Sequence, residues 1–175
     1  MADEAPDRRG DEAELEPRDA TMSDLVALCR ELNARGASYL VCGGFAIRTA
    51  GYVRYTHDID LLVDVALENE AKVFQALEIF PDKAVRELDP GDVAKYVVCR
   101  VADEVLVDLM GSAAGIEYAE AAREVVVREV DGVAIPFASP LLLWRMKRHT
   151  HRVKDAPDLL FLRQLLEAQG ITPPE

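Results

Sequence analysis

The sequence predicts an α+β domain in which helices pack against a mixed, mostly antiparallel sheet of about five strands. Two pairs of apolar runs flank short turns, at residues 95–110 and 124–137, as in antiparallel hairpins. Longer segments carry apolar residues at helical spacing. The last two of these, beginning near residues 139 and 155, predict a C-terminal helical pair.

The composition is that of a soluble globular protein. Of 175 residues, 50% are apolar and 30% charged, and this length suits one domain. Residues 1–20 hold eight acids and three arginines without periodicity, which predicts a disordered acidic tail before a single domain at residues 21–175. No apolar run approaches the roughly 20 residues of a membrane span, and the N-terminus lacks signal-peptide features. We therefore expect a cytoplasmic protein without a membrane partner.

The net charge of −12 argues against broad affinity for nucleic acid, which depends on neutralising phosphates. The tail contributes −5 of this charge and the remainder −7, and a negative total still permits a local basic face. Residues 144–154 carry five Lys or Arg and two His within one predicted helix, on which Lys147, His151 and Lys154 share a side. A solvated helix face and a binding surface are both open interpretations of this stretch.

The elements follow in order from periodicity and from start and stop signals. In the first half these are a helix from residue 23 to the stop at Gly36, a strand over 38–42, a short helix ending near Gly51, a strand over 58–65 and an amphipathic helix over 68–80. In the second half they are an ambiguous segment up to Gly91, a hairpin of 95–101 and 105–110, a helical turn at 116–122, a hairpin of 124–130 and 133–137, a helix from 139 to about 153 and a last helix from 155 to Gly170. Asp131-Gly132 is the strongest hairpin signal, and Ser139-Pro140 is a good helix start.

A Gly pair lies between a predicted strand and a predicted helix. Gly43 and Gly44 let a phosphate approach the backbone closely, and the helix start offers free N–H donors. Asp58 and Asp60 follow two residues apart on a predicted strand, so both side chains point to the same face. Paired carboxylates beside a phosphate-binding loop suit divalent metal ions that carry nucleotide phosphates.

Asp108 lies in the second arm of the first predicted hairpin, inside an otherwise apolar run. A charged residue in the middle of a strand needs a partner or a metal ion. A salt bridge to a neighbouring Lys or Arg satisfies it as a metal does, so both stay open. Three carboxylates that converge without a cation repel one another, which indicates that a metal is bound during use.

The run over residues 41–61 resembles the signature of the polymerase-β-like nucleotidyltransferases: a Gly pair, a spacer, Asp-hydrophobic-Asp, and a third carboxylate on a later strand. With Gly51, Arg54 and Thr56 in the spacer, this version is most similar to the small bacterial nucleotidyltransferases of the AbiEii toxin type. The third carboxylate and the C-terminal helices extend the resemblance over most of the chain.

The resemblance implies the nucleotidyltransferase fold, an NTP substrate and Mg²⁺ or Mn²⁺ as cofactor. It gives the roles of the metal-binding and catalytic carboxylates to Asp58, Asp60 and Asp108. It gives nucleotide contacts to a further set: Gly43, Gly44, Arg54, Thr56 and Lys147. For Arg54 and Thr56, bracing of the loop is an equally open alternative.

The function implied is transfer of NMP from an NTP to a hydroxyl of an acceptor, with pyrophosphate leaving. A toxin-like enzyme that modifies an RNA or tRNA 3′ end or a protein is the leading hypothesis, with a cognate antitoxin as a candidate partner. The first alternative is a small-molecule adenylyltransferase of the aminoglycoside type, although such enzymes carry a larger acceptor-binding portion. The second is a catalytically silent binding module, against which the presence of all three carboxylates and both glycines counts.

Two acids after the basic stretch have two explanations. Asp155 and Asp158 resemble an Asp pattern of the toxin-type group, but around Pro157 they also fit an N-cap and an acid at the third helical position. We favour capping. His57 and Asp64, although close to the paired carboxylates, are given no role.

Overall fold

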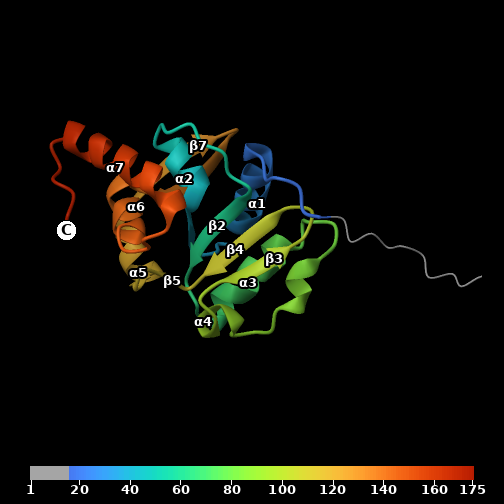
Figure 1. Ribbon diagram of the computed structural model, residues 1–175. Coiled ribbons are helices and arrows are strands. Elements are labelled where there is room, and N and C mark those ends of the chain that lie inside the picture. The colour runs from blue at the N-terminus through green and yellow to red at the C-terminus, as the bar shows by residue number, and fades with distance from the viewer. Residues whose placement is uncertain (1–15) are drawn as a thin grey trace, which may run out of the picture.

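The computed structural model describes residues 16–175 and confirms the α+β class. A mixed sheet runs through the molecule with helices around it (Figure 1). Two very short strands, β5 (Ser112–Ala113) and β6 (Ile116–Glu117), form a separate pair beside it.

The main sheet has six strands in the spatial order β3-β4-β2-β1-β8-β7. Three neighbouring pairs are antiparallel (β3–β4, β1–β2 and β7–β8), whereas β2–β4 and β1–β8 are parallel. The sheet is therefore mostly antiparallel, as predicted, with six strands where about five were expected. In chain order the strands are β1 (Tyr39–Cys42), β2 (Asp58–Val63), β3 (Cys99–Ala102), β4 (Leu106–Met110), β7 (Val125–Val130) and β8 (Val133–Ala138).

Seven α-helices and three short 3-10 helices are present in residues 16–175. The α-helices are α1 (Met22–Ala34), α2 (Gly43–Thr49), α3 (Leu67–Leu77), α4 (Asp92–Lys95), α5 (Tyr118–Ala121), α6 (Pro140–Lys147) and α7 (Ala156–Ala168). The 3-10 helices are η1 (Ala84–Glu87), η2 (Ala122–Glu124) and η3 (Val153–Asp155). From residue 16 onward, none of the helices has the length and apolar character needed to cross a bilayer.

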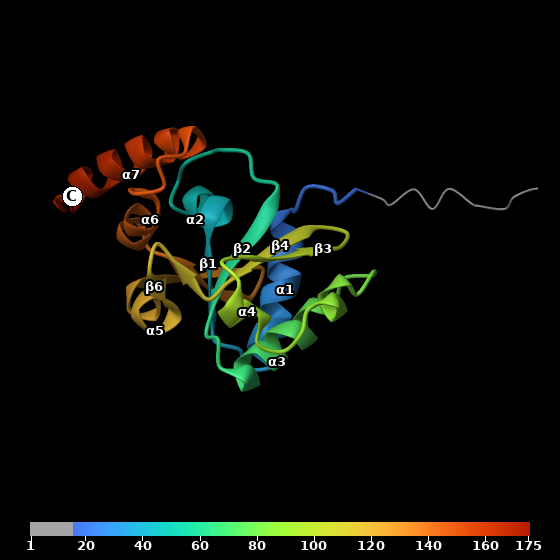
Figure 2. The ribbon, with the colours of Figure 1, turned by 60° about the horizontal axis from the view of Figure 1, so that its bottom comes forward.

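The helices divide between the two sides of the sheet. Helices α1 and α3 pack on each other on one side, and α2, α6 and α7 gather on the other (Figure 2). Along β2, Ile59 and Leu61 are fully buried in the core. Asp58 and Asp60 alternate with them and point to the opposite face, where they stay partly exposed. The predicted alternation of this strand is therefore confirmed.

The helix after β8 begins as predicted but ends earlier. It stops at Lys147, whereas the periodicity suggested an end near residue 153. The Thr150 hydroxyl donates to the Lys147 carbonyl at 3.0 Å, and His151 has a φ of 51°, a left-handed conformation that a helix does not contain. Residues 144–154 are therefore not one helix, and the expectation that Lys147, His151 and Lys154 share a helix face is wrong.

Two other segments differ from the prediction in detail. The first arm of the hairpin around residues 102–104 begins at Cys99, because residues 92–95 form α4 after the left-handed Gly91. The segment 116–122 starts with the short strand β6 before it turns helical. Both hairpins are otherwise confirmed, including the turn at Asp131-Gly132.

The segment before α1 lies along the sheet. Arg18 forms a parallel bridge with Val105, and its N–H donates to the Glu104 carbonyl at 2.9 Å. Ala20 is buried, and its N–H donates to the His57 carbonyl at 3.1 Å. Most of the tail predicted for residues 1–20 lies outside the described residues, but its last part packs on the fold, so the packed structure begins before the predicted boundary.

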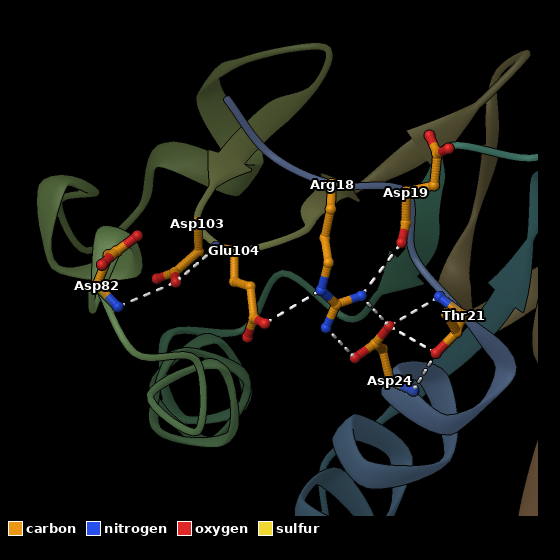
Figure 3. A network of polar contacts seen from close by, with 7 residues as sticks. All are labelled: Arg18, Asp19, Thr21, Asp24, Asp82, Asp103 and Glu104. Carbon is orange, nitrogen blue, oxygen red and sulfur yellow. Dashed lines mark hydrogen bonds and ion pairs between the residues drawn. The ribbon is translucent and has the colours of Figure 1, made fainter. Parts of the chain in front are cut away.

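Arg18 joins this segment to the start of α1 (Figure 3). Its guanidinium makes two 2.8 Å hydrogen bonds to the Asp24 carboxylate and one of 3.1 Å to Glu104. Asp24 also accepts the Thr21 N–H at 2.7 Å, while the Thr21 hydroxyl accepts the Asp24 N–H, a reciprocal capping box. The Arg18 guanidinium, together with these Thr21 bonds, lowers the pKa of Asp24 to about 2.

We predict that Asp24→Asn lowers the free energy of unfolding at about pH 7 by about 1 kcal/mol, because it weakens the charge-assisted hydrogen bonds from Arg18 and from the Thr21 N–H. The folded pKa of Asp24 is below its ordinary value, so the carboxylate stabilises the fold above about pH 4 and stops doing so as the pH falls toward 2. The difference between wild type and variant should therefore shrink with acid in urea titrations. Glu129→Gln, at an exposed strand position, is the control. A difference independent of pH would contradict the role of the charge.

Candidate active site

Three carboxylates meet on the open face of the sheet. Strand β4 lies parallel to β2 in a register that places Asp108 directly beside Asp60. One oxygen each of Asp58, Asp60 and Asp108 lies within 4.8 Å of the others. Asp108 is buried, so its charge is largely removed from water. The geometry thus brings together the three acids that the sequence singled out, while their chemical roles stay predictions.

The cluster is electrostatically unfavourable by itself. Burial, followed by the charges of Asp58 and Asp108, raises the pKa of Asp60 to about 7. The nearby Lys147 and Lys154 act in the opposite direction. Any cation that approaches the Asp60 carboxylate therefore stabilises its charged form.

Arg100, which the sequence analysis did not single out, supplies one such cation. It lies opposite Asp108 in the β3–β4 hairpin, with its Nε 2.8 Å from Asp108 Oδ1 and its Nη2 2.7 Å from Oδ2. The same Nη2 is 3.4 Å from Asp58 Oδ2. Of the two explanations left open for Asp108, the arginine partner is present, and the metal explanation stays a prediction. Matching residues across the predicted hairpin, outward from its turn, would have placed Arg100 opposite Asp108.

The Gly pair serves the cluster by leaving space. Gly43 has a φ of 61°, and a Cβ there would lie 2.0 Å from Asp60 Oδ2. A Cβ on Gly44 would lie 2.4 Å from the Thr56 hydroxyl oxygen. Thr56 is buried and donates to the Asp58 carbonyl at 3.2 Å, so it braces the start of β2. The backbone of α2 can approach β2 this closely only because both residues lack a side chain.

A second charged network ties the C-terminal helices to the loop before β2. Lys147 Nζ lies 2.7 Å from Asp155 Oδ1 and 3.2 Å from Asp158 Oδ2, and Asp158 also pairs with Arg54. Both aspartates are almost fully buried. Asp155 makes no side-chain cap bond to α7 within the described structure, so the favoured capping explanation is wrong for it. These acids are the partners of buried and half-buried cations instead.

Residues of both networks line one cleft of about 480 Å³. The three carboxylates of the cluster and the Gly pair line it, together with apolar groups such as Leu143 and Met146. Five cationic side chains line the cleft: Arg54, Arg100, Lys147, Arg152 and Lys154. Asp155 and the three carboxylates of the cluster line it too, so the cleft places five cations beside four acids. A metal ion in the cluster would add positive charge there, which favours an anionic ligand.

The residues present fit a divalent metal ion. Carboxylate oxygens are the ligands that Mg²⁺ and Mn²⁺ take in proteins, and the cluster offers three that converge from two neighbouring strands. Burial and the charges of Asp58 and Asp108 raise the pKa of Asp60, and a cation bound between these acids would oppose the effect of the two charges. Asp58, Asp60 and Asp108 could therefore hold such an ion.

Two solved structures resemble this fold. An antigenic nucleotidyltransferase-like protein from Paracoccidioides brasiliensis matches with a TM-score of 0.54 and 14% identity, over 87% of this chain and 78% of that one. A candidate nucleotidyltransferase from Thermotoga maritima matches with a TM-score of 0.48 and 18% identity, over 86% of this chain and 97% of that one. No protein-family model matches the sequence, and neither does any curated protein. The first likeness shows that the chain has the fold of a nucleotidyltransferase-like protein.

We predict that Gly43→Ala lowers the free energy of unfolding by more than Gly36→Ala. Both glycines are left-handed, with φ of 61° and 63°, so either alanine carries about 1–2 kcal/mol of backbone strain. A Cβ at position 36 meets nothing within 4 Å, whereas one at position 43 overlaps Asp60. The excess loss at position 43, measured by urea unfolding, reports displacement of Asp60. Equal losses at the two positions would contradict the close approach.

Proposed function

We propose that the chain is a metal-dependent nucleotidyltransferase that moves NMP from an NTP to a hydroxyl of an acceptor. The observation that carries this proposal is the convergence of Asp58, Asp60 and Asp108 beside the Gly pair, in a cleft that five cationic side chains also line. The likeness in fold to a nucleotidyltransferase-like protein supports it.

The reaction is an in-line displacement at the α-phosphorus. A bond forms between the acceptor oxygen and the α-phosphorus, and the bond from that phosphorus to the oxygen of the departing pyrophosphate breaks. A Mg²⁺ or Mn²⁺ ion held by the three carboxylates would supply charge neutralisation to the phosphates. Asp108, at the β3 side of the cluster, is the residue we assign to accept the proton of the acceptor hydroxyl.

The cationic wall of the cleft is assigned to the triphosphate. Lys147 has three N–H donors, and its contacts to Asp155 and Asp158 leave a third for a phosphate oxygen. Arg54 lies on the loop that leads into β2, and its ion pair with Asp158 orients it. The two buried aspartates hold these cations in place before substrate arrives, which lowers the entropy lost on binding. Gly43, Gly44 and Thr56 shape the floor beside them.

The acceptor is assigned to a toxin-like class, an RNA 3′ end or a protein, as the resemblance to AbiEii-type enzymes implies. Arg152 and Lys154, at the exposed end of the cleft, are the contacts we propose for acceptor phosphates. Arg148 belongs to the same basic stretch but bonds to the carbonyl of Glu175, away from the cleft. It therefore provides a matched control.

We predict that nucleotide binding depends on metal. ATP, GTP, CTP or UTP should raise the Tm in the presence of Mg²⁺ or Mn²⁺ and much less in EDTA, because the triphosphate would otherwise meet three uncompensated carboxylates. Asp60→Asn should remove the metal-dependent shift while the protein stays folded by circular dichroism. Asp131→Asn, in the β7–β8 turn, is the control. Equal shifts with and without metal, in wild type and variant, would mean that the nucleotide binds elsewhere.

We also predict that an RNA fraction retains label after the protein is incubated with labelled NTPs, Mg²⁺ and a total cell lysate. Arg152→Gln with Lys154→Gln should slow transfer to RNA about tenfold or more at moderate salt, because each lost phosphate contact weakens binding. Arg148→Gln should leave the rate unchanged. Label on a small molecule would support the aminoglycoside-type alternative, label on protein would favour a protein acceptor, and no label anywhere would support the silent module.

A further inference from the structure

Arg100 lies inside the carboxylate cluster. Its guanidinium takes both oxygens of Asp108 at 2.8 and 2.7 Å, and its Nη2 reaches Asp58 at 3.4 Å. The nitrogen thus sits between two of the three acids that would share a metal ion. Bidentate, charge-assisted pairs of this kind are among the strong hydrogen bonds of proteins.

A metal ion and this arrangement compete for the same oxygens. Mg²⁺ needs its ligand oxygens at about 2.0–2.1 Å, so an ion shared by Asp58 and Asp108 lies close to the place of the Arg100 Nη2. Both groups are positive, and bringing them together inside a partly buried cluster is unfavourable. Asp108 therefore pairs with one cation or the other.

The position of Arg100 on the sheet allows its side chain to move away from the carboxylate cluster. Strand β3 is at the edge of the sheet, and the Arg100 side chain is 54% exposed. Its neighbours Cys99 and Val101 point to the opposite face and are buried, so they hold the strand while the arginine moves. A released Arg100 still lines the cleft.

We propose that Arg100 is an internal counter-ion that occupies Asp58 and Asp108 until the metal ion enters, and that it thereby sets the metal affinity of the site. This inference rests on the proposed function, because it takes the cluster to be a metal site. Arg100 is a positioning residue in this scheme. It keeps the three acids together in the metal-free protein, and its departure frees a cation for an anionic group in the cleft.

The test is a Mn²⁺ titration of the full chain, with free Mn²⁺ followed by electron paramagnetic resonance. Arg100→Gln should bind Mn²⁺ about tenfold more tightly than wild type, because the competitor is gone. Arg100→Lys keeps the positive charge but loses the two-pronged contact, so its Mn²⁺ affinity should lie between those of wild type and Arg100→Gln. In EDTA, Arg100→Gln should melt below wild type, and saturating Mn²⁺ should close most of that gap. This second readout also shows that the variant folds.

Two controls separate competition from general charge effects. Lys154→Gln removes a positive charge from the same cleft, and Lys154 shows no ion pair with a carboxylate within residues 16–175. Arg86→Gln breaks a two-pronged pair between Arg86 of η1 and Glu78, neither of which lines the cleft. Arg86→Gln should leave Mn²⁺ binding unchanged, and Lys154→Gln should tighten it clearly less than Arg100→Gln does.

The outcomes distinguish this inference from the proposal on which it rests. If wild type and Arg100→Gln both fail to bind Mn²⁺, the metal site and the proposed function fall together. If wild type binds Mn²⁺, Asp60→Asn does not, and Arg100→Gln binds no more tightly than wild type, only the counter-ion role is overturned. Equal tightening in Lys154→Gln and Arg100→Gln overturns it as well, because charge alone would then explain the effect.

Discussion

The parallel pairing of β2 with β4 is the constraint on which the site depends. Its register sets Asp60 beside Asp108, and like charges this close in a half-buried place are unfavourable without a cation. Neighbouring residues reduce this repulsion or leave room for the carboxylates. Arg100 neutralises one side of the cluster, Gly43 leaves room for the Asp60 carboxylate, and Lys147 adds positive charge from the C-terminal helices.

Structural features that follow from local sequence pattern could be predicted from the sequence. Features that depend on side-chain contacts between separate elements could not. Alternation alone placed Asp58 and Asp60 on one face, and the Asp131-Gly132 turn located the second hairpin. The end of α6 was missed because the helical period continues past Lys147, whereas the Thr150 hydroxyl bonds to the Lys147 carbonyl and His151 is left-handed. Asp155 itself fits a capping pattern, yet its side chain accepts hydrogen bonds from Lys147, Thr150 and Arg152 instead.

The cleft has two kinds of positive charge. Lys147 and Arg54 are held by buried aspartates, so their positions are fixed before any ligand binds. Arg100 is paired with the cluster itself, which makes its position depend on what the cluster holds. A largely acidic protein can therefore present a prearranged anion site and a conditional one within the same 480 Å³ cleft. Four of the five cations pair with carboxylates, which limits the mutual repulsion of the five.

The two sides of the cleft come from separate stretches of the chain. The three acids of the cluster come from β2 and β4, while Lys147 comes from α6 and Lys154 from η3. Asp158 of α7 pairs with Lys147 and with Arg54 of the loop before β2. Such a division permits independent evolution of the two sides. The helical pair can change its surface and length, and so the molecules it admits, while the sheet and its acids remain as they are. Under the proposed function, the cleft would then admit different acceptors beside the same three acids, with the chemistry unchanged.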